Sequence, residues 1–132
     1  MLNLPTEVLR VFDPSTLTEP CVAVRSLFDL EGKIGETHVI ADRHQLHLLS
    51  RPLAGAFVKA SAPLARVERM HLRTEGLYQL LEFRLDGQER VVRCTTWDQP
   101  ELEKLLALGQ GRVPDSEPRS GDSPDRGSLS GT

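Results

Sequence analysis

The chain has 132 residues, 39% of them hydrophobic and 27% charged, and its 16 basic and 19 acidic side chains give a formal net charge of −3. This size and composition predict one soluble globular domain. The negative net charge argues against a protein held on nucleic acid or anionic lipid by its overall charge, and no apolar run approaches the roughly 20 residues that cross a bilayer.

The first element in chain order is a short helix in an N-terminal extension. Residues 5–12 predict one or two helical turns capped by Thr6, and residues 13–15 predict a turn. Pro20 then delays the next element.

From residue 21 the hydrophobic pattern has a period of two, which predicts β-strands. Seven strands are expected, at residues 21–28, 37–41, 45–50, 56–60, 67–73, 77–85 and 90–96. Asp86 and Gly87 give the clearest hairpin signal, because both central positions of a type I′ turn need a positive φ. In the fifth strand, Met70 and Leu72 share one face. The apolar face of the sixth strand is expected to carry Leu77, Leu81, Phe83 and Leu85.

A capped amphipathic helix is expected after the seventh strand. Asp98 as N-cap and Glu101 three residues later form a capping-box pattern, while Trp97 and Leu102 occupy the positions of a hydrophobic staple. Gly109 is expected to end the helix as a C′ glycine. The predicted apolar stripe consists of Leu102, Leu105 and Leu106.

Composition divides the chain into a body, residues 1–109, and a tail, residues 110–132. The tail consists largely of Gly, Pro, Ser and charged residues, and only Val113 and Leu129 offer a useful side chain for burial. Burial would not offset the entropy cost of ordering this segment, so disorder is expected. A solvated terminus without a role is the favoured interpretation, and a phosphorylated or partner-binding arm is the alternative.

Seven strands followed by one helix resemble the pleckstrin-homology-like (PH-like) superfold over about residues 20–109. Residues 37–49 look like the second hairpin of bacterial members, and residues 80–97 with 101–106 look like their last hairpin and capping helix. The resemblance implies a mainly β fold, in which sheets of four and three antiparallel strands form a β-sandwich or partly open barrel closed at one end by the helix. The chain departs from many members at Trp97, which precedes the helix instead of lying within it.

The resemblance permits binding of a lipid head group or a membrane surface. Members that bind inositol phosphates do so with several Lys and Arg around the first hairpin loop. Here the matching positions offer Arg25 and Lys33 among three carboxylates, those of Asp29, Glu31 and Glu36. Because several charge-assisted contacts are needed to hold a phosphate against water, lipid binding is the weaker alternative.

A cationic surface is expected on the fifth to seventh strands. Its candidate partner-binding residues are Arg69, His71, Arg73, Arg84, Arg90 and Arg93. If these side chains converge, they form a docking surface for an acidic partner protein. The alternative interpretation is an ordinary solvated sheet face, in which the cations alternate with Glu68, Glu82 and Glu89. Like charge from its arginine neighbours would disfavour the protonated form of His71.

Catalytic and metal chemistry have little support in the sequence. His44 and His47 are three residues apart, which places them on opposite faces of a strand and works against joint coordination. Cys94 stands between strand residues and fits a small, buried and inert thiol. No nucleophile motif or phosphate-binding loop is present, so no catalytic residue, metal or cofactor is expected.

The sequence therefore predicts a non-catalytic protein-binding module, an adaptor in a bacterial cytoplasm. Two cysteines are too few for a disulfide framework, and the first residues lack the pattern of a secretory signal. The expected partner is a protein, not a nucleic acid, bound on the cationic surface or as a strand added to an exposed sheet edge. The alternatives are a lipid-head-group module, a metal-assisted enzyme using Asp42, His44 and His47, and a scaffold that assembles through an edge strand.

Overall fold

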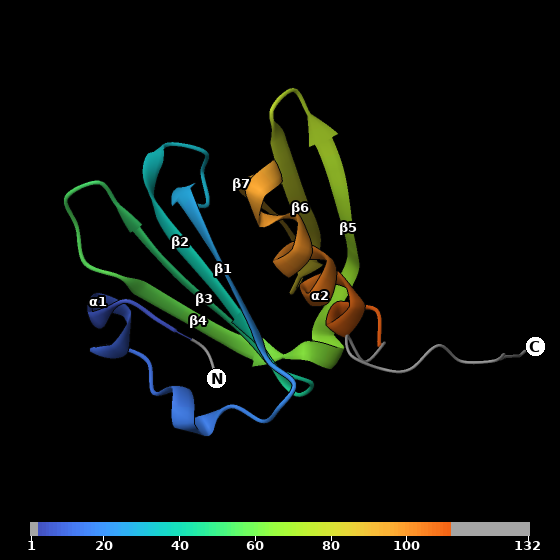
Figure 1. Ribbon diagram of the computed structural model, residues 1–132, viewed down its shortest axis with the longest axis horizontal. Helices are drawn as coiled ribbons and strands as arrows, with labels where there is room; N and C mark the ends of the chain where they lie inside the picture. Colours follow the sequence, from blue (N-terminus) through green and yellow to red (C-terminus); the bar gives the residue numbers. More distant parts are fainter. Residues whose placement is uncertain (1–2, 112–132) are drawn as a thin grey trace, which may run out of the picture.

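The computed structural model describes residues 3–111 and consists mainly of two antiparallel sheets with a C-terminal helix (Figure 1). The four-stranded sheet has the order β1 (Val22–Phe28), β2 (Ile34–Ala41), β3 (Gln45–Pro52) and β4 (Val58–Pro63). The three-stranded sheet has the order β5 (Val67–Glu75), β6 (Tyr78–Leu85) and β7 (Gln88–Thr95). The predicted mainly β sandwich with a closing helix is confirmed. The tail predicted to be disordered lies outside the described residues, apart from residues 110 and 111.

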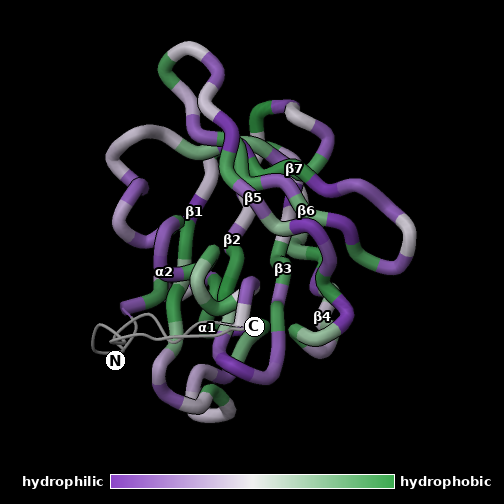
Figure 2. The backbone as a smooth tube through the Cα atoms, turned by 90° about the vertical axis from the view of Figure 1, so that its right-hand side faces the viewer, coloured by the Kyte–Doolittle hydropathy of each residue, from purple (hydrophilic) through white to green (hydrophobic). Residues whose placement is uncertain are grey.

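Hydrophobic alternation places the main core between the sheets. Figure 2 shows apolar stretches of β1, β2 and β3 running through the interior. The core side chains of the four-stranded sheet include Val24, Val39, Leu46 and Leu48, and those of the other sheet include Met70, Leu81, Phe83 and Val92. The hairpin at Asp86 and Gly87 is confirmed, with φ angles of 53° and 80°. The fourth strand, expected at residues 56–60, lies at residues 58–63. Its buried side chain is that of Ala62, beyond the end of the expected range.

The closing helix α2 (Gln99–Gly109) contacts β1 and β5 and covers one end of the sandwich (Figure 1). Its side chains Leu102, Leu105 and Leu108 are buried, whereas Leu106 is half-buried against the same core. The stripe therefore follows the i, i+3, i+6 positions of one helix face. The prediction of an amphipathic closing helix is confirmed, and the buried Leu108 is added to it.

The start of this helix differs from the prediction. A 3₁₀ turn, η3 (Thr96–Asp98), precedes α2, and the capping box joins Thr95 to Asp98. The Asp98 carboxylate accepts hydrogen bonds from the Thr95 backbone N–H at 3.0 Å and from its hydroxyl at 3.2 Å, so it does not cap α2. Trp97 is 90% exposed and forms no staple with Leu102. The sequence contains two overlapping capping-box patterns, Thr95 with Asp98 and Asp98 with Glu101, and the first of them forms.

The predicted role of Gly109 is also wrong. The residue with a positive φ of 80° is Gly111, which lies beyond the C-cap Gln110. Gly109 is the last residue of α2 and lies against Met70 of β5, where an added Cβ would come within 2.3 Å of the methionine sulfur. The missing side chain lets the helix approach β5 closely.

The N-terminal extension covers the outer face of the four-stranded sheet. Its helix α1 (Thr6–Leu9) has Pro5 as N-cap and no side-chain cap, so the predicted capping by Thr6 is wrong. Asp13 accepts a hydrogen bond from Ser15 at the start of the 3₁₀ turn η1 (Pro14–Thr16), which confirms the predicted turn. A second core forms under this segment from Val8, Phe12, Ile40 and Leu49. The middle of β2 is therefore buried on both faces.

Candidate functional site

The cations on the outer face of the three-stranded sheet are mostly neutralised within the sheet. Arg73 lies 2.6 Å from Glu82 and 3.4 Å from Glu75, measured from guanidinium nitrogen to carboxylate oxygen. Arg84 pairs with Glu89 at 3.7 Å. The hydrogen bonds from Arg73 are the main cause of the lowered pKa of Glu82. Much of the predicted cationic surface is thus an ordinary solvated sheet face on which cations and carboxylates alternate, which was the alternative interpretation of the sequence.

His71 also belongs to this network of paired charges. Its Nδ1 lies 2.8 Å from the Arg69 carbonyl oxygen and its Nε2 lies 2.8 Å from Glu82 Oε1. Both ring nitrogens face acceptors, which only the protonated imidazole can satisfy with two donors. The hydrogen bond to the Arg69 carbonyl and the one to Glu82 raise the pKa of His71, and they outweigh the opposite effect of like charge that was expected and that comes from Arg73.

Arg69 is set apart by its backbone. It has a φ of 56° and lies where the β5–β6 register shifts between Glu68 and His71. This bulge lets Val67 and Met70, three residues apart, both face the core. The backbone of Arg69 therefore forms part of the bulge, while the Arg69 side chain is exposed.

Arg90 and Arg93 lie on opposite faces of β7. Arg93 pairs across the sheet with Leu80 and belongs to the outer face, whereas Arg90 pairs with the core residue Phe83. The six candidate residues therefore do not converge on one surface. The signal was present in the sequence, because two strand residues three positions apart face opposite sides.

Arg90 lines a cleft of about 410 Å³ between the two sheets. Leu48 pairs with Ala60 and Ser50 with Val58, so these side chains continue the inward face of the four-stranded sheet beyond the core. The lining residues are Asp29, Leu30, Glu31, Leu48, Ser50, Arg51, Pro52, Val58, Ala60, Leu85 and Arg90. The walls are mainly apolar, which is the character of a ligand or side-chain pocket.

The charges at this cleft are unequally satisfied. Asp29 accepts hydrogen bonds from the backbone N–H groups of Glu31 and Lys33, each at 2.9 Å, and Glu31 lies 3.8 Å from the Lys33 ammonium. Arg51 is bound to carboxylates on the outer face. Within residues 3–111, Arg90 has only the neutral Gln88 as a hydrogen-bond partner, at 2.9 Å. The cleft thus offers a guanidinium to an incoming anion.

The free edge of β4 adjoins this cleft. β4 pairs with β3 on one side, and no strand of the described chain pairs with its other side. Val58 is 71% exposed although it belongs to the inward face of the sheet. The sequence suggested binding at a sheet edge without locating it, and the structure places an open edge beside an apolar cleft.

The cations proposed for lipid binding are both paired. Arg25 Nε lies 3.1 Å from Glu36 Oε2, and the Lys33 ammonium lies 3.8 Å from Glu31. Binding a phosphate requires several cations that are free of carboxylate partners, and these two are already paired. This geometry weakens the lipid-head-group interpretation.

Sequence reasoning missed a polar network beneath α1. Glu36 accepts hydrogen bonds from Arg51 at 2.7 and 3.0 Å, and its other oxygen lies 2.8 Å from Nε2 of the buried His38. Burial lowers the pKa of His38 and outweighs the opposite effect of Glu36. Burial raises the pKa of Glu36, but hydrogen bonds from His38 and Arg51 outweigh it and hold that pKa below its ordinary value. No local motif marks these residues, because β2 and β3 bring them together.

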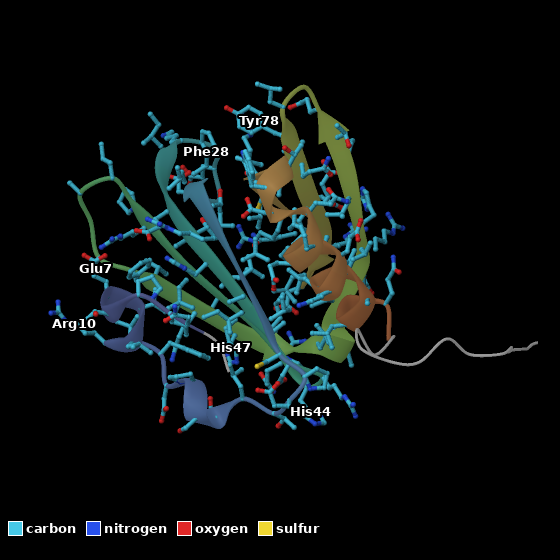
Figure 3. All side chains as sticks on the ribbon, viewed as in Figure 1. Glu7, Arg10, Phe28, His44, His47 and Tyr78 are labelled. Atoms are coloured by element: carbon cyan, nitrogen blue, oxygen red, sulfur yellow. The ribbon has the colours of Figure 1, made fainter. Side chains whose placement is uncertain are left out.

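The residues of the metal-assisted alternative have separate structural roles. Asp42 accepts hydrogen bonds from the backbone N–H groups of Thr18, His44 and Gln45, each at 2.8 Å. His47 Nδ1 lies 2.7 Å from Ser61 Oγ, and Figure 3 shows the two histidines at separate places on the chain. No group of three or more metal-ligating side chains occurs in the described part of the molecule. Nothing in this arrangement points to coordination.

The thiols also fit structural roles. Cys94 is buried in β7, and burial raises its pKa to about 12, which keeps it protonated near neutral pH. Cys21 is half-buried, and both cysteines are free thiols.

No helix among residues 3–111 is long and apolar enough to cross a membrane. Neither the protein-family models nor the curated proteins contain a match to this chain.

Proposed function

We propose that this chain is a non-catalytic protein-binding module, an adaptor with a PH-like fold, that binds an extended peptide of its partner along β4. The carrying observation is the free edge of β4 beside the cleft that holds Arg90. The arrangement of four and three strands with a closing helix supports the PH-like part of the proposal. The resemblance to bacterial members and the two free cysteines support a bacterial cytoplasm.

Backbone chemistry at the edge supports a strand as the occupant. An edge strand presents N–H and C=O groups to any chain that can lie beside it. A peptide added there gains main-chain hydrogen bonds, and its alternate side chains point to the same face as Val58 and Ala60. Those side chains would enter the cleft.

The lining of the cleft supports a particular peptide composition. Leu48, Val58 and Leu85 favour apolar side chains, while Arg90 favours a carboxylate. An extended peptide with apolar residues at alternate positions and one acidic residue on the same side satisfies the edge, the apolar walls and the guanidinium together. This partner retains the acidic character expected from the sequence.

Selection from a random peptide library displayed on phage tests the proposal. Peptides recovered on the immobilised protein should alternate apolar residues and carry an acidic residue in register with them. Synthetic versions should bind Val58→Asp and Arg90→Glu about tenfold more weakly than the unchanged protein, equal to about 1.4 kcal/mol.

Two exposed positions outside the cleft lining provide matched controls. Leu53→Asp introduces the same charge in the loop before β4, and Arg10→Glu reverses a charge at the C-cap of α1 (Figure 3). Both variants should bind like the unchanged protein. Peptides that bind the cleft variants and the controls equally, or that show no acidic preference, would remove the proposal.

A further inference from the structure

A separate feature lies where the two sheets meet at the ends of β1 and β6. The guanidinium carbon of Arg93 is 5.3 Å from the ring centroid of Phe28 and 5.3 Å from that of Tyr78. The two rings meet edge to face with their centroids 5.8 Å apart, and Figure 3 places them at neighbouring ends of the sheets. Cation–π attraction from both rings holds the guanidinium in place.

Arg93 differs from its neighbours in having no acceptor. Arg73 and Arg84 on the same face pair with carboxylates. Within residues 3–111, Arg93 has ring contacts but no side-chain hydrogen bond or ion pair, and its Nε is buried without a partner. Buried donors are nearly always satisfied, so this Nε–H is an exception, and the terminal N–H groups of the same guanidinium are the ones that an external acceptor can meet.

Two large exposed apolar side chains belong to the chain segments next to Tyr78 and Thr95. Leu77 directly precedes Tyr78, and Trp97 lies two residues beyond Thr95, which pairs with Tyr78. Leu77 is 83% exposed, in contrast to its predicted place on the core face, because it lies in the turn before β6. An exposed Trp and an exposed Leu on the segments that adjoin the Tyr78–Thr95 pair, together with an unpaired Arg, have the composition of an interface centre.

We propose that Arg93 is a second binding site, which takes a carboxylate from an acidic side chain of a partner protein while Trp97 and Leu77 contact the apolar residues beside it. The planar guanidinium edge matches a carboxylate with two parallel N–H···O bonds. Its position on the face of β7 opposite Arg90 separates it from the β4 cleft. The site therefore stands independently of the peptide proposed for β4.

The local charges favour a carboxylate over a phosphate. Tyr78 pairs across the sheet with Glu75 and Thr95, and the Thr95 backbone holds the Asp98 carboxylate. These acids place negative charge near the site, while Arg73, which pairs across the sheet with Leu80 as Arg93 does, is bound to Glu82 and Glu75. A dianionic phosphate usually needs several cations, whereas one guanidinium is enough for a monoanion.

The Arg Nε–H signals in a ¹H–¹⁵N NMR spectrum of the unchanged protein test the site directly. At constant ionic strength, acetate should move the Arg93 signal in a saturable way, inorganic phosphate should move it less, and chloride should not move it. A signal that acetate leaves in place overturns the proposal, and a larger response to phosphate overturns the carboxylate assignment.

A peptide pair tests the apolar contacts. Acetylated Leu-Glu-Phe amide should change the fluorescence of Trp97, which is the single Trp of the chain, and its Gln analogue should bind about tenfold more weakly. Arg93→Lys keeps the charge but lacks the planar fork, and it should lose the preference for Glu, while Arg84→Gln keeps it. Equal binding of the two peptides contradicts the proposal. Val58→Asp separates the two sites, because it should leave this binding unchanged while it weakens binding at β4.

Discussion

Glu7 of α1 and Arg51 of β3 form an ion pair of 2.8 Å that ties the N-terminal extension to the sheet beneath it. The same guanidinium lies 2.7 Å from Glu36, so one arginine links the covering segment to the buried polar network. Phe57 adds to this contact, with its ring centroid 4.4 Å from the guanidinium carbon. The extension is thus anchored by charge at its rim and by apolar packing at its centre.

These two kinds of anchor should differ in strength. Glu7→Gln removes an ion pair with one exposed partner and should cost about 0.2–1 kcal/mol of unfolding free energy. Val8→Ala removes a fully buried side chain and should cost about 2 kcal/mol. Urea-induced unfolding measures both values, and Val11→Ala on the exposed side of the same segment is the matched control. Equal costs for Val8→Ala and Val11→Ala would mean that the extension is not packed against β2 and β3.

Stability should depend on pH through His38. Because burial places the pKa of His38 in the folded protein below that in the unfolded chain, the unfolded chain binds more protons as the pH falls. This contribution to stability is present above about pH 6.5 and is lost as the pH falls through the folded value. His38→Gln should flatten the decline of the unfolding free energy on the acid side. A slope that the substitution leaves unchanged assigns the decline to other groups, among them His47, whose pKa burial also lowers.

His71 should affect the pH dependence of stability in the opposite direction to His38, because its pKa is raised. Hydrogen bonds from its ring to the Arg69 carbonyl and to Glu82 raise its pKa, so its stabilising contribution is present below about pH 6.5 and is lost as the pH rises through the raised value. The side chain is exposed, so the effect on stability should be small. An NMR titration should give His71 a pKa above 6.5 that moves back toward that value in Glu82→Gln. An unchanged pKa in that variant would show that the pairing with Glu82 has no influence.

Truncation of Trp97 and of Leu102 should change the unfolding free energy by very different amounts. Trp97→Ala should change the unfolding free energy by less than about 0.5 kcal/mol, because this side chain packs against little of the molecule. Leu102→Ala removes a fully buried side chain and should cost about 2–5 kcal/mol. Thermal or urea unfolding measures both. A large loss in Trp97→Ala would restore the hydrophobic staple predicted from the sequence.

Gly109 and Met70 should be energetically coupled. Gly109→Ala gains helix propensity of about 1 kcal/mol but forces a methyl group against the methionine sulfur, and overpacking typically costs about 1–3 kcal/mol. The expected net result is a small loss of stability. In a double-mutant cycle, the loss should disappear when Met70 is replaced by Val, which lacks the sulfur at that place. Additive effects would mean that α2 can move away from β5 without cost.

The parts of the fold that the sequence predicted are those that local pattern determines. Alternation along each strand and the Asp86–Gly87 turn depend on neighbouring residues, and both are found in the structure. The choice between the two capping patterns around Asp98 depends on how β7 enters the helix, which a local pattern does not contain. The position of the N-terminal extension depends on Val8 and Phe12 meeting Ile40 and Leu49, which are distant in sequence.

The candidate site was predictable in part. Periodicity alone places Arg90 and Arg93 on opposite faces of a strand. The pairing of Arg73 with Glu82 requires the β5–β6 register, and the bulge at Arg69 alters that register. The contact of Arg93 with Phe28 joins the last strand to the first, and no pattern within either strand indicates it.

The double burial of β2 restricts how this protein can vary. In a strand with one solvent-facing side, every second position accepts many residue types without loss of stability. Residues 37–41 of β2 are buried without exception, since the main core lies on one side and the N-terminal extension on the other. A saturation library should therefore find this pentapeptide among the least substitutable segments of the chain, at odd and even positions alike.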